Sequence, residues 1–209
     1  MKTENVALDV SDLPVSELDH RSLVWWGNVL MMVIETTVFA LLVASYLYVR
    51  MNFGHWPPPQ PNRFPPLAAE YPSIPMGLTT VIPLLISLIP MIWADRAALK
   101  LKANAVRWGL FLSILAGGVI AYLRFRELRY LPFDWDDNAY ASIVWTLCGM
   151  HLMHIVVATC ENIVMFAWAV VHSLDKKHAR DVRVNAVYWY WVVGIWVLLF
   201  CIIYVGPRI

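Results

Sequence analysis

Charged residues are scarce in this chain. They make up 15% of its 209 residues, whereas soluble globular domains carry roughly 25%. The 16 basic and 15 acidic residues leave a formal net charge of +1, so the sequence lacks the basic excess typical of nucleic-acid binding. Hydrophobic residues account for 60% of the chain, and eleven residues are tryptophan. This composition excludes an ordinary soluble domain and indicates an integral membrane protein.

Cysteine is also rare and scattered. Cys148, Cys160 and Cys201 each lie alone inside an apolar stretch, far from one another in the sequence. This spacing fits neither a disulfide framework nor a CxxC redox motif. We therefore interpret all three as small buried hydrophobic residues.

The amino-terminal segment 1–22 has no apolar core. It carries five acidic residues in its first twenty positions, so it is predicted to be a polar tail and not a signal peptide. Of the 16 lysines and arginines, ten would face the inside if this tail is cytoplasmic, and six would face the outside. The positive-inside rule then predicts a cytoplasmic amino terminus and a periplasmic carboxyl terminus.

Long apolar runs fill the remainder, 23–209. A helix needs about 20 apolar residues to cross a hydrocarbon core of about 30 Å. The predicted fold is therefore all-α, an integral membrane bundle of five transmembrane helices in one domain. The expected spans are about 24–49, 76–93, 108–123, 140–172 and 186–205.

Two of these runs are irregular. Pro83 and Pro90 lie seven residues apart in the second run, which predicts a kink there because proline removes a backbone donor. The fourth run is 33 residues long, so it must tilt, bend or project from the membrane.

One acid interrupts the first run. Glu35 is the only charged residue between Val24 and Arg50, and an ionised group near the middle of a span is costly unless it faces a partner. His151, His154 and Glu161 share one stripe of the fourth run at helical periodicity. His154 and Glu35 fall at similar depth, so we expect them to pair.

Three interpretations of these four residues stay open. They form a structural polar network, a proton relay, or a metal site, since imidazole and carboxylate suit iron, zinc or copper. A membrane heme pair needs more histidines than His151 and His154, and no cysteine–histidine–methionine cluster is available for copper electron transfer. We therefore expect no redox centre, metal or cofactor in this chain itself.

Polar and aromatic residues also gather near the span ends. Arg124 and Glu127 lie at the outer end of the third run, where a solvated helix end and a phospholipid headgroup site are both plausible. Trp56 and Trp189 are expected at the headgroup level.

The order of several motifs resembles subunit III of the heme-copper terminal oxidases. The segments that carry the resemblance are Trp26-Gly27 with Ile34–Phe39, Trp56-Pro57-Pro58 with Ile74-Pro75, Gly117-Gly118 with Glu127, Cys148–Ile155, and Tyr188–Trp196 with Tyr204 and Gly206. Together they cover about residues 22–207, and both histidines of the family's GxHGxHV signature are present.

The sequence departs from the family pattern at a few positions. Tyr190 and Val193 stand where the family has histidine and aspartate, Arg124 replaces a glutamine, Leu78 replaces an asparagine, and Glu161 is additional. The five-span count fits the shorter bacterial form, which lacks the first two of seven helices. The resemblance therefore implies a divergent branch.

The resemblance implies a non-catalytic subunit in a bacterial inner membrane. In the family, subunit III packs against subunit I, binds structural phospholipid, and helps sustain turnover and proton uptake. Heme and copper in subunits I and II reduce O₂ to water, coupled to proton pumping. The acid that matches Glu35 is buried and reacts with carbodiimides, and Glu127, His151 and His154 complete the matching polar set.

Other functions stay open. Relatives of subunit III accompany nitric oxide reductases, and an autonomous membrane metalloenzyme would use His151, His154, Glu161 and Glu35. A small ion transporter fits less well, because the sequence has no inverted repeat. The electron donor, cytochrome c or quinol, is not encoded in any motif of this chain.

Overall fold

The computed structural model describes residues 23–54, 56–58 and 72–208. The predicted polar tail and part of the proline-rich loop lie outside this range. The helices are α1 (Leu23–Met51), α2 (Ile74–Ile86), α3 (Leu88–Leu99), α4 (Ala103–Arg129), α5 (Ala139–Val171) and α6 (Lys176–Phe200). A π-helical turn, η1 (Cys201–Val205), and a 3₁₀ turn, η2 (Gly206–Arg208), continue α6.

The described residues contain five helices that are long and apolar enough to cross a membrane, as the sequence predicts. They are α1, the α2–α3 pair, α4, α5, and α6 with its terminal turns. Several extend beyond the apolar runs: α4 covers 27 residues where the run at 108–123 has sixteen. Its length of about 40 Å reaches the headgroup regions.

The second span is interrupted at Ser87. Pro83 lies inside α2 and Pro90 inside α3, so the expected kink is confirmed as a break between two helices. The Ser87 hydroxyl donates to the Leu84 carbonyl at 2.6 Å and satisfies a backbone acceptor at the break.

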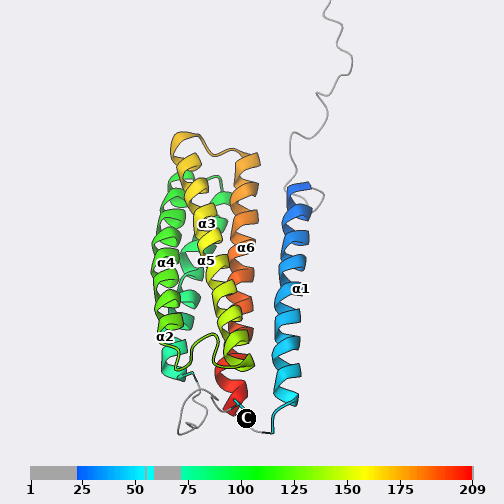
Figure 1. Cartoon of the computed structure of the whole chain (residues 1–209). Helices are drawn as coiled ribbons and strands as arrows, with labels where there is room; N and C mark the ends of the chain where they lie inside the picture. Colours follow the sequence, from blue (N-terminus) through cyan, green and yellow to red (C-terminus); the bar gives the residue numbers. More distant parts are fainter. Residues whose placement is uncertain (1–22, 55, 59–71, 209) are drawn as a thin grey trace, which may run out of the picture.

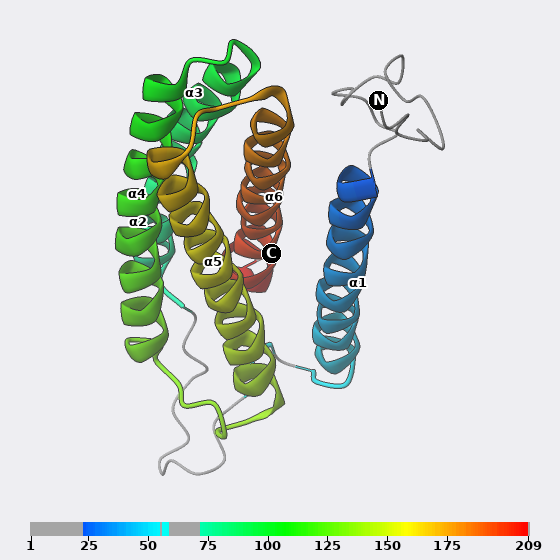
Figure 2. The same ribbon diagram turned by 90° about the horizontal axis from the view of Figure 1, so that it is seen from above.

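The helices form a bundle with α1 at one edge. It lies beside α5 and α6, while α4 occupies the opposite side against α5 (Figures 1 and 2). We use "Leu23 end" for the end of the bundle where α1 begins and "Arg208 end" for the opposite one. The predicted orientation of these ends in the membrane stays a prediction.

Glycines set the spacing of α4. A Cβ on Gly117 would collide with the Thr159 side chain of α5. A Cβ on Gly109 would come within 2.7 Å of the Ala94 Cβ of α3. Each of these positions has room only for the hydrogen atom of glycine. The two glycines therefore let α4 pack closely on α5 and α3.

Candidate functional site

The predicted pair of the first and fourth spans is confirmed. Glu35 Oε2 on α1 lies 3.6 Å from His154 Nε2 on α5. The side chains are 23% and 10% exposed, respectively. The distance is longer than a hydrogen bond, and Glu35 Oε2 has no hydrogen-bond partner among the described residues.

The other nitrogen of His154 fixes its tautomer. Nδ1 lies 2.7 Å from the Met150 carbonyl oxygen. Because a carbonyl only accepts hydrogen bonds, Nδ1 carries a hydrogen, and Nε2 of the neutral ring presents a lone pair to Glu35. The pair therefore places an imidazole nitrogen of α5 against a carboxyl oxygen of α1 inside the bundle.

Aromatic side chains surround this pair. The His154 ring centroid lies 5.1 Å from that of Phe39 and 5.5 Å from that of Trp191. Trp191 Nε1 donates to Thr36 Oγ1 at 2.8 Å and so ties α6 to α1 next to Glu35. The rings hold the two helices around the acid and separate it from much of the hydrocarbon.

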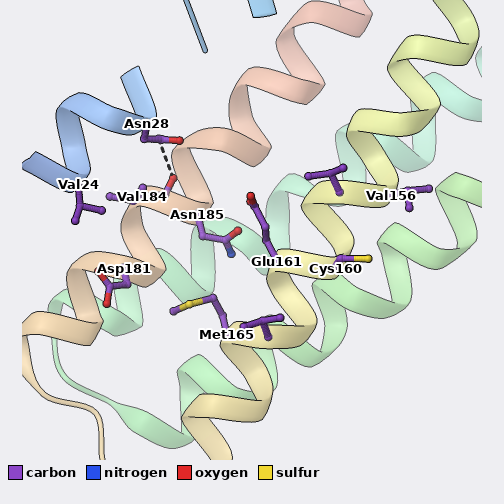
Figure 3. Close-up of a pocket in the computed structure, with 11 residues that line it drawn as sticks. Val24, Asn28, Val156, Cys160, Glu161, Met165, Asp181, Val184 and Asn185 are labelled. Carbon is purple, nitrogen blue, oxygen red and sulfur yellow. Dashed lines mark hydrogen bonds between the residues drawn. The ribbon is translucent and has the colours of Figure 1, made fainter. Parts of the chain in front are cut away.

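Glu161 belongs to the same region. It is half-buried on α5, seven residues after His154 and so about two turns nearer the Leu23 end. The buried Tyr188 hydroxyl of α6 donates a hydrogen bond to the Glu35 carboxyl group. Glu161 also lines a groove of about 530 Å³ between α1, α5 and α6 (Figure 3).

His151 does not join this group. Its Nε2 donates to the Val192 carbonyl at 3.1 Å, and its ring lies 4.7 Å from that of Trp196. Side chains three positions apart on a helix point in directions that differ by about 60°. His151 and His154 therefore face different neighbours. In the part of the chain that the structure describes, no three His, Cys, Asp or Glu residues come together as a metal site. The predicted set of four is thus divided.

A second polar cluster lies inside the bundle toward the Arg208 end. Arg124 Nη1 donates to Glu127 Oε2 at 2.8 Å, and Thr80 of α2 and Tyr204 of η1 also donate to this carboxylate. Arg124 and Glu127 are 0% and 2% exposed. The predicted solvated or lipid-facing helix end is therefore wrong, because α2, α5 and α6 cover this turn of α4.

The second cluster extends to Trp196. The Arg124 Cζ lies 3.2 Å from the centroid of the Trp196 ring, a cation–π contact between α4 and α6. The sequence did not single out Thr80, and it named Trp196 and Tyr204 only as parts of the motif resemblance, with no role in a polar cluster. Thr80 and Trp196 lie in apolar runs with no local pattern to distinguish them from other core residues.

The two predicted headgroup tryptophans differ. Trp189 is fully buried and donates from Nε1 to Ser87 Oγ at 3.0 Å, so its expected position at the membrane surface is wrong. Its contact secures the break between α2 and α3. Trp56 is half-buried, donates to the Tyr46 hydroxyl at 3.1 Å, and packs edge-on against Tyr140.

The departures from the family pattern are accommodated in the packing. The Tyr190 hydroxyl donates to Asp95 Oδ2 at 3.4 Å, and Val193 is 3% exposed in the core. Among the cysteines, Cys148 is buried as predicted, whereas Cys160 and Cys201 are exposed on the surface of the bundle. The interpretation of all three as buried residues is wrong for these two.

The fold and the two clusters define a multi-pass α-helical membrane protein with paired ionisable groups between its helices. A sequence model of the family described as "Cytochrome c oxidase subunit III" matches residues 19–207, so the chain belongs to this family. The resemblance inferred from the motifs is thereby confirmed.

Several animal proteins named cytochrome c oxidase subunit 3 are similar to this chain. That of Anopheles gambiae is 27% identical over 184 residues, which are 86% of this chain and 68% of the mosquito protein. That of Homo sapiens is 27% identical over 151 residues, 72% of this chain and 55% of the human protein. That of Drosophila yakuba is 26% identical over 184 residues, 86% of this chain and 68% of the fly protein. The chain spans about half to two thirds of the length of these relatives.

Proposed function

We propose that this chain is a non-catalytic subunit III of a respiratory heme-copper terminal oxidase. The oxidase reduces O₂ to water on heme and copper in subunits I and II, and couples this to proton pumping. The observation that carries the proposal is the family match over residues 19–207. We place the chain in a bacterial plasma membrane, with a cytoplasmic Leu23 end and a periplasmic Arg208 end.

Its first role is to support proton uptake by the complex. In the Glu35–His154 pair a carboxyl oxygen lies 3.6 Å from an imidazole nitrogen, and both are side chains that can take up a proton. Glu35 is partly exposed on α1, the helix at the edge of the bundle. A protonatable group in that position buffers protons near a partner subunit without a redox centre of its own.

Its second role is to bind phospholipid and stabilise subunit I. An apolar groove of about 510 Å³ runs along α2, α3 and α4 where the chain breaks at Ser87. Pro83, Pro90, Leu115 and Ile120 line it, and their surfaces match an acyl chain. Bound lipid would fill this groove and stiffen the broken span.

The test uses the assembled complex. The tagged chain is purified in mild detergent, and its partners are identified by mass spectrometry. We expect a multi-helix heme protein and a copper-bearing subunit. Glu35→Ala should leave the initial turnover rate unchanged but shorten the catalytic lifetime several-fold. Thr37→Val, a change at an exposed residue on the same helix, is the matched control.

Two results would contradict the proposal. One is co-purification with a nitric oxide reductase in place of an oxidase. The other is stoichiometric heme or copper in the isolated chain, as the autonomous metalloenzyme hypothesis requires. Lipid extraction with analysis of the retained phospholipids tests the second role, with Leu115→Trp as the groove-filling variant.

A further inference from the structure

The groove of about 530 Å³ between α1, α5 and α6 is lined by two carboxyl side chains, Glu161 and Asp181, and we call it the acidic groove. We propose that the acidic groove receives the basic end of a transmembrane helix from another subunit, with a lysine or arginine side chain reaching the two carboxyl groups. This inference names a contact within the assembly, and it rests on the proposed function for the orientation of the bundle in the membrane.

The two carboxyl groups come from different helices. Glu161 belongs to α5 and Asp181 to α6, and no lysine or arginine of the described residues lines the groove. A hydrogen bond of 2.7 Å from Asn185 Nδ2 to Asn162 Oδ1 joins these helices. Glu161 is next to Asn162 in the chain, and Asp181 lies about one turn before Asn185. The two carboxyl groups therefore lie within about 8 Å of each other in depth along the bundle.

The remaining wall of the acidic groove is apolar and accessible. Val24 of α1 and Val156, Val157 and Val164 of α5 line it, and all four side chains are exposed. Figure 3 shows Glu161 reaching from α5 toward α6 above this wall. Lysine and arginine have an apolar stem and a charged head. Their stem matches the valines, and their head matches the carboxyl groups.

The other polar side chains of the lining are two amides, Asn28 and Asn185. Each donates an amide N–H to a neighbouring helix, Asn28 to the Val184 carbonyl at 3.3 Å and Asn185 to Asn162. Two carboxylates and two amides together offer more acceptors than donors. Lysine and arginine carry only donors. The lining is therefore complementary to a cationic donor, and it disfavours a carboxylate or a phosphate group.

The depth of the acidic groove matches the place where transmembrane helices carry basic residues. Val24 lies in the first turn of α1, and Asp181 lies in the second turn of α6. Both are near the Leu23 end, which we place in the cytoplasm. Lysine and arginine are most frequent on the cytoplasmic side of transmembrane helices. A partner helix that packs beside α1 thus brings its basic residues to the level of the carboxyl groups.

The first helix has a free face for such a partner. Of the most apolar stretch of α1, 11% is buried inside the chain, against 28% to 44% for the other spans. The helix lies at the edge of the bundle (Figures 1 and 2). An ionised carboxyl group within a span is costly without a counter-ion. A partner helix covers α1 and supplies that counter-ion.

The amino-terminal tail of this chain is a poorer match for the acidic groove. Residues 1–22 end next to the groove, but they contain five acidic and two basic residues. A segment with a negative net charge is repelled by two carboxylates. The charge of the groove therefore favours a basic segment from another chain.

Photo-crosslinking in the assembled complex identifies the occupant. Val164, which is exposed and lines the groove, is replaced by p-benzoylphenylalanine, and adducts formed in native membranes are mapped by peptide mass spectrometry. We expect an adduct with another subunit, in a peptide where a lysine or arginine ends an apolar run. An adduct with residues 1–22, with a second copy of this chain or with phospholipid alone would overturn the proposal, and so would the absence of any adduct.

The same replacement at Phe125 is the control for the cross-link. Phe125 is exposed on α4 and does not line the acidic groove. It should form no adduct with the peptide that Val164 captures. Capture of the same peptide from both positions would show that the cross-link does not report the groove.

Charge reversal tests the ion pair. Glu161→Lys places a like charge against the incoming base, so we expect about tenfold less of the partner to be retained on the purified chain. Glu161→Gln keeps the shape of the side chain and should reduce retention about threefold. Asp136→Lys is the matched control, because it makes the same charge change at an exposed residue between α4 and α5. It should change retention by less than about twofold.

A compensating change keeps the test independent of folding defects. In the Glu161→Lys chain, changing the cross-linked base of the partner to glutamate should restore retention, which a misfolded chain does not allow. Unchanged retention in both Glu161→Lys and Glu161→Gln would overturn the ion pair.

The outcomes separate this inference from the proposed function. Co-purification with an oxidase, together with a Val164 adduct of phospholipid alone, would contradict the docking site and leave the function intact. An adduct with a basic helix end of a complex that is not an oxidase would contradict the function and leave the docking site intact.

Discussion

The guanidinium of Arg124 stacks on the indole of Trp196, with 3.2 Å between Cζ and the ring centroid. The two residues come from α4 and α6, and the same guanidinium donates to Glu127 at 2.8 Å. A ring face and a carboxylate thus replace the water that a charged side chain would lose inside a membrane. The ion pair is thereby accommodated in the interior of the bundle.

Glu127→Gln should be strongly destabilising. It leaves the Arg124 charge buried without its counter-ion, which costs about 3–5 kcal/mol of the free energy of unfolding. The double variant Arg124→Gln, Glu127→Gln removes both charges and should recover most of that loss. Unfolding of the purified chain in detergent, followed by tryptophan fluorescence, measures both.

Arg126→Gln is the control for that pair, because Arg126 lies two residues away on the exposed face of α4. Its effect should stay within about 0.5 kcal/mol. If the double variant is as unstable as Glu127→Gln alone, the interaction of the two charges is not the source of the effect.

Gly117→Ala should weaken the contact between α4 and α5. The added methyl collides with the Thr159 side chain, and overpacking of this kind costs about 1–3 kcal/mol. The neighbouring change Gly118→Ala should be neutral or slightly stabilising, since nothing lies within 4 Å of its added methyl. Thr159→Ala should rescue Gly117→Ala, and a failure to do so would contradict the assigned contact.

Ser87→Ala should destabilise the break between α2 and α3. It leaves the buried Nε1–H of Trp189 without an acceptor, a loss of about 1–3 kcal/mol. Ser45→Ala is the control, because the exposed Ser45 hydroxyl bonds only to a carbonyl of its own helix. Equal unfolding midpoints for Ser87→Ala and the wild type would show that the Trp189 contact contributes nothing.

Asp175 gives the start of α6 a pH dependence. Its carboxylate accepts from the His178 backbone N–H at 2.8 Å, and this hydrogen bond lowers the pKa of Asp175 from its ordinary value of 3.8. A lowered pKa adds stability above the unfolded value, and the contribution disappears as the pH falls below about 3.8 through the folded value.

Asp175→Asn keeps an acceptor oxygen but does not titrate, so it should remove this acidic step from the stability profile. Asp175→Ala should lower stability at neutral pH, where the wild-type cap is intact. Circular dichroism of thermal unfolding between pH 3 and 7 compares the three chains. An identical acidic step in Asp175→Asn would assign the step to another group.

Hydropathy and periodicity predicted the membrane bundle and the Glu35–His154 pair, because both depend on local properties of one helix at a time. The same patterns placed Trp189 and Arg124 wrongly, because they carry no information on the neighbouring helices. A tryptophan near the end of an apolar run and an arginine near a helix end are normally at the membrane surface. Only neighbouring helices decide whether such a residue is covered.

The sequence by itself determined five hydrophobic spans, a break near the paired prolines, and the depth of one acid against one imidazole. The tertiary structure alone decided that His151 and His154 serve different clusters, that Arg124 and Glu127 are internal, and that Glu161 lines a groove between α1, α5 and α6. The physical reason is that span length and depth follow from the rise of a single helix. Burial and pairing follow from which helix faces meet, and contacts between residues distant in the chain set those faces.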